Sequence, residues 1–285
     1  MLFSPYLFAW SHYNPKYIIN SLSTCIDHNI PSITLAFLVN NKYDEINDWI
    51  DEIRQFNNKI NIRLSIGGAN GWIKDQGQTC DEVFEEIKDL LHRSGIREID
   101  LDIEGEVLEN DKKIEDLIKI VKLLLKEMEL VISLTLPVEF NGGLNEFAIN
   151  TICKFQQNRI NIRYVNLMLM DFFTPFNGDW YIKHIEIIEY VYRNQLNRLG
   201  IDYNHMGICP MIGENDDHTK FTLNDWNHLL NFAISKNIGL ITFWAINRDQ
   251  KNKGNGLKFW KSSINTHSNC QDKDLLYTEM VLNKL

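Results

Sequence analysis

The sequence of 285 residues lacks the features that mark zinc-binding, disulfide-bonded and membrane-spanning proteins. Its 5 cysteines are scattered and include no C-x-x-C pair, and its 8 histidines form no H-E-x-x-H motif. We therefore expect reduced, mostly packed thiols and no metal site. No apolar run approaches the ~18 to 20 residues that a membrane-spanning helix needs, so we expect no membrane association.

Basic residues are outnumbered, with 29 Lys and Arg against 38 Asp and Glu, which gives a net charge of −9. A duplex-binding protein needs a broad basic stripe, so nucleic acid is not an expected partner. No glycine-rich phosphate loop is present, and we expect no cofactor. The first residues, MLFSPYLFAWSHY, lack a basic leader and resemble a first strand. We expect no cleavable signal peptide in this chain, and hence a cytoplasmic location or export without such a leader. We also expect a monomer.

Proline is scarce, with 6 residues, and no proline- or glycine-rich linker divides the chain. With 44% hydrophobic and 11% aromatic residues the composition is that of an ordinary globular protein. Short apolar runs of strand length alternate with longer amphipathic segments, and this alternation repeats along the chain. Strands are predicted at Tyr6 to Trp10, Ser32 to Val39, Asn61 to Ile66, Glu98 to Ile103, Leu130 to Leu136, Arg163 to Asp171, Met206 to Met211 and Leu240 to Trp244.

Helices are predicted between these strands, and local signals mark several of their ends. Thr79 precedes Glu82 at the spacing of a capping box, and Gly95 and Gly200 follow helical runs. The predicted helices are Pro15 to His28, Asp44 to Phe56, Thr79 to Arg93, Lys112 to Met128, Leu144 to Gln157, Trp180 to Leu199, Leu223 to Lys236 and a weaker one at Leu257 to Ser263. Eight strand-helix units predict an α/β fold with a single (β/α)8 TIM barrel over residues 1–265, rather than an open sheet. Residues 266–285 form a C-terminal extension, for which an extra helix packed on the barrel is one interpretation.

The strongest chemical signal is the segment EIDLDIEG, which ends the fourth predicted strand. Side chains alternate along a strand, so Asp100, Asp102 and Glu104 share one face. Three carboxylates close together repel one another, and we expect at least one to hold a proton near neutral pH, shared by Asp100 and Asp102 or by Asp102 and Glu104. A solvated polar face, or a ligand set for Mg²⁺ or Ca²⁺, is the alternative.

Other segments accompany this run in a fixed order. RLSIGG ends the third strand, MLMD ends the sixth, PMIG ends the seventh and FWAINRD ends the eighth. Together with D-x-D-x-E they resemble the motifs of family 18 glycoside hydrolases, the chitinase family, from about Pro5 to Asp249. The resemblance implies a glycosidase that cleaves β-1,4 links next to N-acetylglucosamine, in chitin or chito-oligosaccharides, with retention of anomeric configuration.

The resemblance also implies roles for individual residues. Glu104 would be the general acid and base, Asp102 would orient the substrate's acetamido group, and Asp100 would tune Asp102. Substrate-binding residues would be Asp171, Trp244 and Met168, with Trp244 as the floor beneath the reacting sugar. Gly67 and Gly68 would let the backbone pack closely beneath the carboxylates.

Three positions depart from the family pattern. Arg97 and Glu98 stand where the family has an Asp-Gly pair, and Met170 stands where many members have a tyrosine. These departures put the tuning of Asp100 and the hold on the acetamido group in doubt. An endo-β-N-acetylglucosaminidase acting on glycoprotein glycans, a chitinase-like lectin that binds without cleaving, and a metal-dependent hydrolase remain as alternatives.

Overall fold

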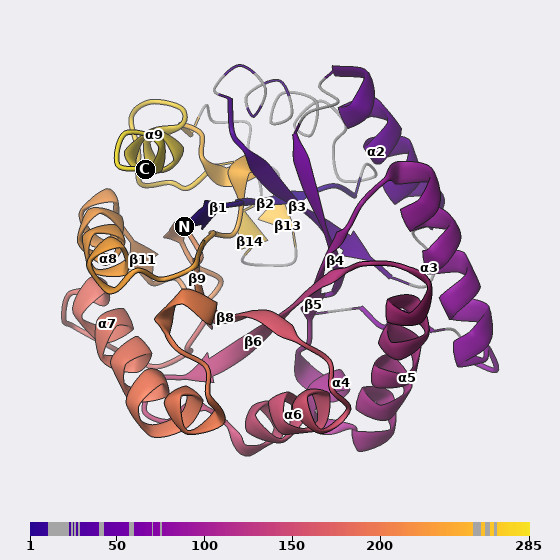
Figure 1. The fold of residues 1–285 in the computed structure, drawn as a ribbon. Helices are drawn as coiled ribbons and strands as arrows, with labels where there is room; N and C mark the ends of the chain where they lie inside the picture. Colours follow the sequence, from indigo (N-terminus) through magenta and orange to yellow (C-terminus); the bar gives the residue numbers. More distant parts are fainter. Residues whose placement is uncertain are drawn as a thin grey trace.

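The computed structural model describes residues 1–10, 23, 25, 27, 29–39, 43–56, 60–69, 71–74, 76–252, 258–259, 263–264 and 267–285. In this part of the chain a parallel sheet forms the centre of the molecule, and helices surround it (Figure 1). The strands of the central sheet are β1 (Leu2–Phe3), β2 (Tyr6–Phe8), β3 (Ser32–Leu38), β4 (Asn61–Gly67), β5 (Glu98–Asp102), β6 (Val131–Glu139), β8 (Ile162–Leu169), β9 (Met206–Pro210) and β12 (Leu240–Ile241). A short β7 (Gly143–Leu144) is antiparallel to β6.

The first strand position of the barrel is divided into two segments, β1 and β2, which lie at the two ends of the sheet and join them. The order of strands is β1-β12-β9-β8-β6-β5-β4-β3-β2, so the two ends of the sheet are consecutive segments of the chain. β1 pairs with β12, β2 pairs with β3, and between them the backbone N–H of Ser4 donates to Ile241. Eight strand positions therefore form the closed parallel barrel that the alternation predicts.

The helices on the outside carry the predicted end signals. Thr79 and Glu82 form a reciprocal capping box at the start of α3, and Gly95 ends that helix in the left-handed conformation at φ 70°. The helices are α2 (Tyr43–Phe56), α3 (Cys80–Ser94), α4 (Gly105–Glu109), α5 (Asp111–Glu127), α6 (Glu146–Gln157), α7 (Trp180–Val191), α8 (Leu223–Lys236) and α9 (Leu276–Leu282). None of the helices in the described ranges is long and apolar enough to cross a membrane.

Alternation along the strands separates two environments. On β5, Ile99 and Leu101 join the large apolar cluster under the helices, whereas Asp100 and Asp102 face the barrel interior. The same division holds on β6, where Leu134 points outward and Thr135 lies inside. The interior is therefore polar at the level of the acids.

Three sequence expectations need correction or qualification. The weak helix expected at Leu257 to Ser263 is wrong, since the described residues there are two short antiparallel strands, β13 (Lys258–Phe259) and β14 (Ser263–Ile264). Only two residues of the eighth predicted strand form β12, and Trp244 joins the sheet through one isolated bridge to Met211. The helix expected at 15–28 lies outside the described residues, apart from single positions.

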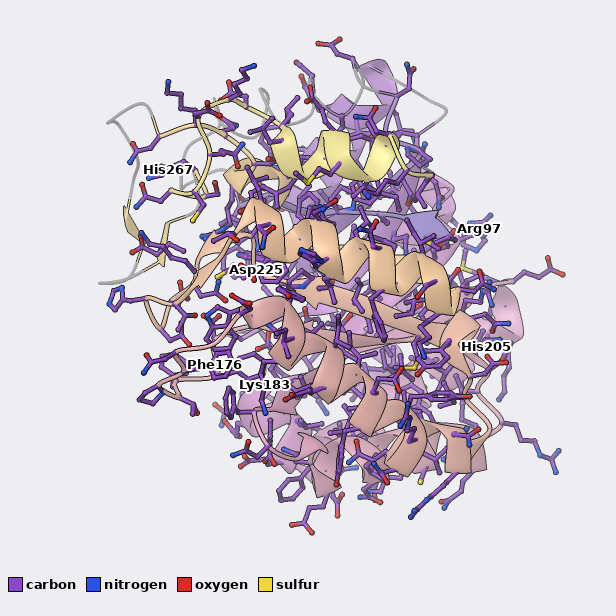
Figure 2. All side chains as sticks on the ribbon, turned by 90° about the vertical axis from the view of Figure 1, so that its left-hand side faces the viewer. Arg97, Phe176, Lys183, His205, Asp225 and His267 are labelled. Atoms are coloured by element: carbon purple, nitrogen blue, oxygen red, sulfur yellow. The ribbon has the colours of Figure 1, made fainter. Side chains whose placement is uncertain are left out.

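The two ends of the barrel differ in what they carry. Figure 2 shows Arg97 and His205, which precede β5 and β9, at one end, and Phe176, which follows β8, at the other. His267, from the C-terminal extension, lies at the same end as Phe176 in this view. The carboxyl ends of the strands, where barrel enzymes hold their chemistry, are therefore on the side of Phe176 and His267.

Candidate active site

The acidic column, Asp100, Asp102 and Glu104, rises along β5 toward the carboxyl end of the barrel. Asp100 is fully buried and Asp102 is 6% exposed. Glu104 follows the strand with extended backbone angles, φ −134° and ψ 169°, and α4 begins directly after it. Its side chain therefore continues the inward alternation of the strand past the last ladder hydrogen bond.

Asp100 is surrounded by hydroxyl groups from three other strands. Tyr6 Oη and Ser65 Oγ each donate to Asp100 Oδ2 at 2.7 Å, and Thr135 Oγ1 donates to Oδ1 at 2.7 Å. Asn166 Nδ2 in turn donates to Thr135 Oγ1 at 3.0 Å. The Asp100 carboxylate is thus an acceptor toward all three hydroxyls, and its position is fixed from both sides of β5.

Asp102 and Glu104 interact through their side chains, and the pKa values of both carboxyls are raised. Burial, followed by the nearby charges of Glu104 and Asp100, raises the pKa of Asp102 well above its usual value. Burial raises the pKa of Glu104 to about 6. Of the two sharing arrangements expected from the sequence, the raised pKa values of Asp102 and Glu104 favour the one between these two residues.

One oxygen of the pair has no partner of its own. Asp102 Oδ1 is buried and makes no hydrogen bond with any described residue. A buried carboxylate oxygen left without a donor is costly, so this atom is suited to accept from an N–H group that a bound substrate brings. Among the described residues no group of three or more His, Cys, Asp or Glu is arranged to hold a metal ion.

Gly67 and Gly68, at the end of β4, pack directly against Asp102, as predicted. Gly67 has φ +114°, and a Cβ atom built there would lie 2.1 Å from the backbone oxygen of Asp102. The backbone N–H of Gly68 donates to the same oxygen at 3.0 Å. Glycine is required here both by the backbone conformation and by the lack of space.

Trp244 lies in a cluster of aromatic rings beside the column. Its ring stacks on Phe37 at 5.4 Å between centroids and meets Tyr6 and Phe8 at 5.8 and 5.6 Å. Sequence reasoning missed Phe37, whose strand shifts register between Leu35 and Leu38. Such a bulge redirects side chains, and the inward position of Phe37 does not follow from a period of two.

Met168, on β8, and Met170, just after β8, both lie near the barrel interior. Met168 is half-buried and occupies the same face of β8 as the inward-facing Asn166. Met170 packs against the small interior cluster of Tyr6, Ala36, Cys209 and Ala245, together with Phe37 and Trp244. The residue that departs from the family pattern thus packs in the same cluster as Trp244 and Phe37.

Asp171 is half-buried and held by the loop between two short antiparallel strands, β10 (Gly213–Glu214) and β11 (Lys220–Phe221). Its Oδ1 accepts from the backbone N–H of Asp216 at 2.7 Å, and its own N–H donates to Asn215 Oδ1 at 3.4 Å. Burial, and then the charge of Asp216, raises the pKa of Asp171 to about 7. Asn215 and Asp216 were not predicted, because no spacing in the sequence links them to the sixth strand.

Comparison with known proteins places this geometry in a family. The sequence matches the profile of glycosyl hydrolases family 18 over residues 3–204. It is 25% identical over 283 residues to a probable bifunctional chitinase/lysozyme of Escherichia coli K12, and 25% identical over 280 residues to endochitinase 11 of Metarhizium anisopliae. Each alignment covers 85% of this chain but only 31% and 53% of those relatives, so the chain spans about a third and about half of their length.

The solved structure of active domain 2 of a chitinase from Pyrococcus furiosus, in catalytic site mutants, has the same fold. It superimposes with a TM-score of 0.80 at 24% identity, covering 99% of this chain and 94% of that one. The fold and the order of motifs agree with the family expected from the sequence, which is a family of chitinase-type glycoside hydrolases. The chain belongs to family 18 of the glycosyl hydrolases.

Proposed function

We propose that the chain hydrolyses β-1,4 linkages next to N-acetylglucosamine, in chitin or chito-oligosaccharides, with retention of anomeric configuration. The observation that carries the proposal is the buried pair of Asp102 and Glu104, whose pKa values are both raised by burial, beside Asp100, which accepts hydrogen bonds from three hydroxyl groups. The names of the two relatives, a chitinase/lysozyme and an endochitinase, support the same substrate class.

In the first step Glu104 gives its proton to the glycosidic oxygen as the bond to the anomeric carbon breaks. The acetamido oxygen of the same sugar attacks that carbon and forms a cyclic oxazolinium intermediate, so the enzyme needs no carboxylate nucleophile. Asp102 accepts the acetamido N–H through its buried oxygen and stabilises the positive charge.

In the second step Glu104, now a carboxylate, takes a proton from water as the water oxygen attacks the anomeric carbon. The acetamido oxygen leaves, and the sugar is released with its original configuration. Trp244 forms the floor under the reacting sugar, with Phe37 behind it, and Asp171 and Met168 contact the substrate at the mouth of the barrel.

Incubation with defined N-acetylglucosamine oligomers tests the proposal, with product sizes measured by chromatography and the first anomer formed measured by NMR. We expect shorter oligomers whose new reducing end is initially the β anomer. Release of sugar from a high-mannose glycoprotein, with intact chitin oligomers, would instead identify an endo-β-N-acetylglucosaminidase. Binding of oligomers without any cleavage would identify a lectin, and an initial α anomer would contradict the mechanism.

A further inference from the structure

A buried arginine lies at the foot of the acidic column. Arg63, on β4, is 1% exposed, and its Nη2 lies 3.9 Å from Asp100 Oδ1. Its Nε lies 3.3 Å from Glu98 Oε2, and its Nη1 donates to Thr34 Oγ1 at 3.1 Å. In the parallel register Arg63 is opposite Glu98, and Ser65 is opposite Asp100. The cation is therefore built into the barrel interior one step below the column.

The guanidinium of Arg63 is stabilised mainly by the nearby carboxylates of Glu98 and Asp100. Nε and Nη2 face carboxylates but make no hydrogen bond of good geometry with any described residue. Arg63 Cζ also lies over the ring of Tyr164, 6.0 Å from the ring centroid. A buried cation is costly unless opposite charge compensates it, and Glu98 and Asp100 supply that charge. Glu98 is itself positioned by Asn61, whose Nδ2 donates to Oε1 at 2.7 Å.

A cation at one end makes the column electrostatically unequal along its length. Arg63 lies next to Glu98 and Asp100, at the end of the column opposite to Glu104, so its positive charge acts most strongly on that end. The other titratable groups that face Asp100 and Asp102 from the neighbouring strands carry no charge, since burial raises the pKa of Tyr6 and of Cys209 well above their usual values. Ser65 and Thr135 contribute neutral hydroxyls.

We propose that Arg63 is a positioning residue that keeps the negative charge of the column at Asp100 and so directs the exchangeable proton to Asp102 and Glu104, while Glu98 sets how much of the arginine's charge Asp100 experiences. This inference rests on the proposed function and deepens it. It also gives a role to Glu98, which departs from the family pattern and otherwise has no part in the reaction.

The pH dependence of kcat/KM on chito-oligosaccharides tests this role. Arg63→Met removes the cation, so all carboxyls of the column become weaker acids, and we expect the acidic limb to move up by about one pH unit or more. Arg63→Lys retains the charge and should restore most of the original profile. Glu98→Gln removes the competing carboxylate but keeps the contact with Asn61, so the acidic limb should move down.

Arg97→Met is the matched control, because it removes one positive charge at the amino end of β5 from an exposed side chain outside the interior. We expect it to leave both limbs of the profile in place. A merely structural role for Arg63 predicts lower activity in Arg63→Met and Glu98→Gln with no opposite movement of the limbs. That result, or equal shifts in Arg63→Met and Arg97→Met, would overturn the proposal.

A direct titration separates this proposal from the proposed function. Carboxyl ¹³C resonances of the protein, assigned by comparison with Asp100→Asn and Glu104→Gln, report the proton without any substrate. In the original protein we expect the proton near neutral pH on Asp102 and Glu104, and in Arg63→Met we expect Asp100 to take part in the titration. If oligomers are not cleaved, the proposed function fails, but this titration still decides the role of Arg63. If Arg63→Met does not fold, the titrations of Glu98→Gln and Arg63→Lys decide the role of Arg63. Unchanged titration in Arg63→Met or Glu98→Gln contradicts the inference, and so does a titration in Arg63→Lys that departs from that of the original protein.

Discussion

In the proposed mechanism Glu104 gives a proton to the substrate, and burial beside Asp102 raises the pKa of Glu104 to about 6, which lets it hold that proton near neutral pH. We expect Glu104→Gln to lower kcat on chito-oligosaccharides by roughly 10²-fold to 10⁴-fold, because glutamine keeps the shape but has no proton to transfer. Binding of the oligomers should persist. Steady-state kinetics, with binding followed by tryptophan fluorescence, measures both effects.

Glu106→Gln is the control for this change. Glu106 lies two residues further along the chain, is 81% exposed and pairs with Lys113 at the surface. The same chemical change there should leave kcat within about twofold, since exposed ion pairs contribute little. Full activity of Glu104→Gln would remove Glu104 from the mechanism, whatever the family of the chain.

Asp171 gives a prediction about stability and pH. Its pKa is raised to about 7 in the folded protein, so the folded state binds a proton more tightly than the unfolded state does. The stability from this group is fully present below the ordinary carboxyl pKa of about 4 and is lost as the pH rises toward 7. We expect Asp171→Asn to raise Tm by a few degrees at pH 8 and to change it little at pH 4.

Thermal unfolding at the two pH values measures this difference. Asparagine retains an oxygen that can accept from the N–H of Asp216, so the substitution removes charge and keeps the contact. Asp217→Asn, in the same loop, is the comparison, since Asp217 accepts from the N–H of Thr219. An equal rise of Tm at pH 4 and pH 8 would show that packing, not the charge of Asp171, is responsible.

At the scale of single elements, the end of β4 supports Asp102 through its backbone. Gly67→Ala would place a Cβ atom 2.1 Å from a carbonyl oxygen at a φ of +114°. We expect a loss of about 3 kcal/mol or more in the free energy of unfolding, since both the backbone conformation and the contact are unfavourable. Denaturant unfolding measures the loss, and residual activity at low temperature should fall because Asp102 moves.

Gly77→Ala separates the two causes. Gly77 also has a positive φ, +87°, but a Cβ atom there would meet nothing within 4 Å. Only the conformational cost remains, and we expect about 1 kcal/mol. Similar losses for the two variants would mean that the contact between Gly67 and Asp102 relaxes freely.

The regularity of each strand determines which parts of the site could be predicted from the sequence. The period of two along β5 places Asp100 and Asp102 inside the barrel correctly, because both faces of that strand are regular. The partners of Asp100 could not be predicted, since Tyr6, Ser65 and Thr135 come from three other strands and meet only when the barrel closes. Phe37 was missed because it lies within the register shift of β3, between Leu35 and Leu38. The local pattern thus predicts which face of a strand a residue occupies. Its neighbours from other strands are determined only when the barrel closes.

In the molecule as a whole, the first and the last strand of the barrel are joined by side-chain hydrogen bonds close to Trp244. The Asn247 side chain bonds the backbone of Phe8 in both directions, Oδ1 accepting at 2.9 Å and Nδ2 donating at 3.1 Å. This pairing continues the seam between the first and last strands where the ladder of β12 has ended. Phe8 and Trp244 are thereby held in contact across the seam.

The C-terminal extension is fastened to the same segment through Asp249. This carboxylate is fully buried and accepts from the backbone N–H groups of Tyr277 and Thr278 and from Gln271 Nε2, at 2.8 to 3.2 Å. Two of these donors belong to the first turn of α9. Trp226 Nε1 donates to Tyr277 O at 2.9 Å, so α8 holds the same turn from the other side. Asp249 therefore connects α9 to the loop that carries Trp244.

We expect Asp249→Ala to release α9, because it leaves buried N–H donors without an acceptor, at a cost of about 2 to 4 kcal/mol. Limited proteolysis should then cleave the final twenty or so residues first, and hydrogen exchange should show loss of protection at Tyr277 and Thr278. Asp272→Ala, an exposed residue in the same extension, should change neither readout. Since Asp249 lies five residues after Trp244, a released extension should also raise KM for chito-oligosaccharides. Protection of α9 that survives Asp249→Ala would mean that the apolar contact of Tyr277 with the core holds the extension on its own.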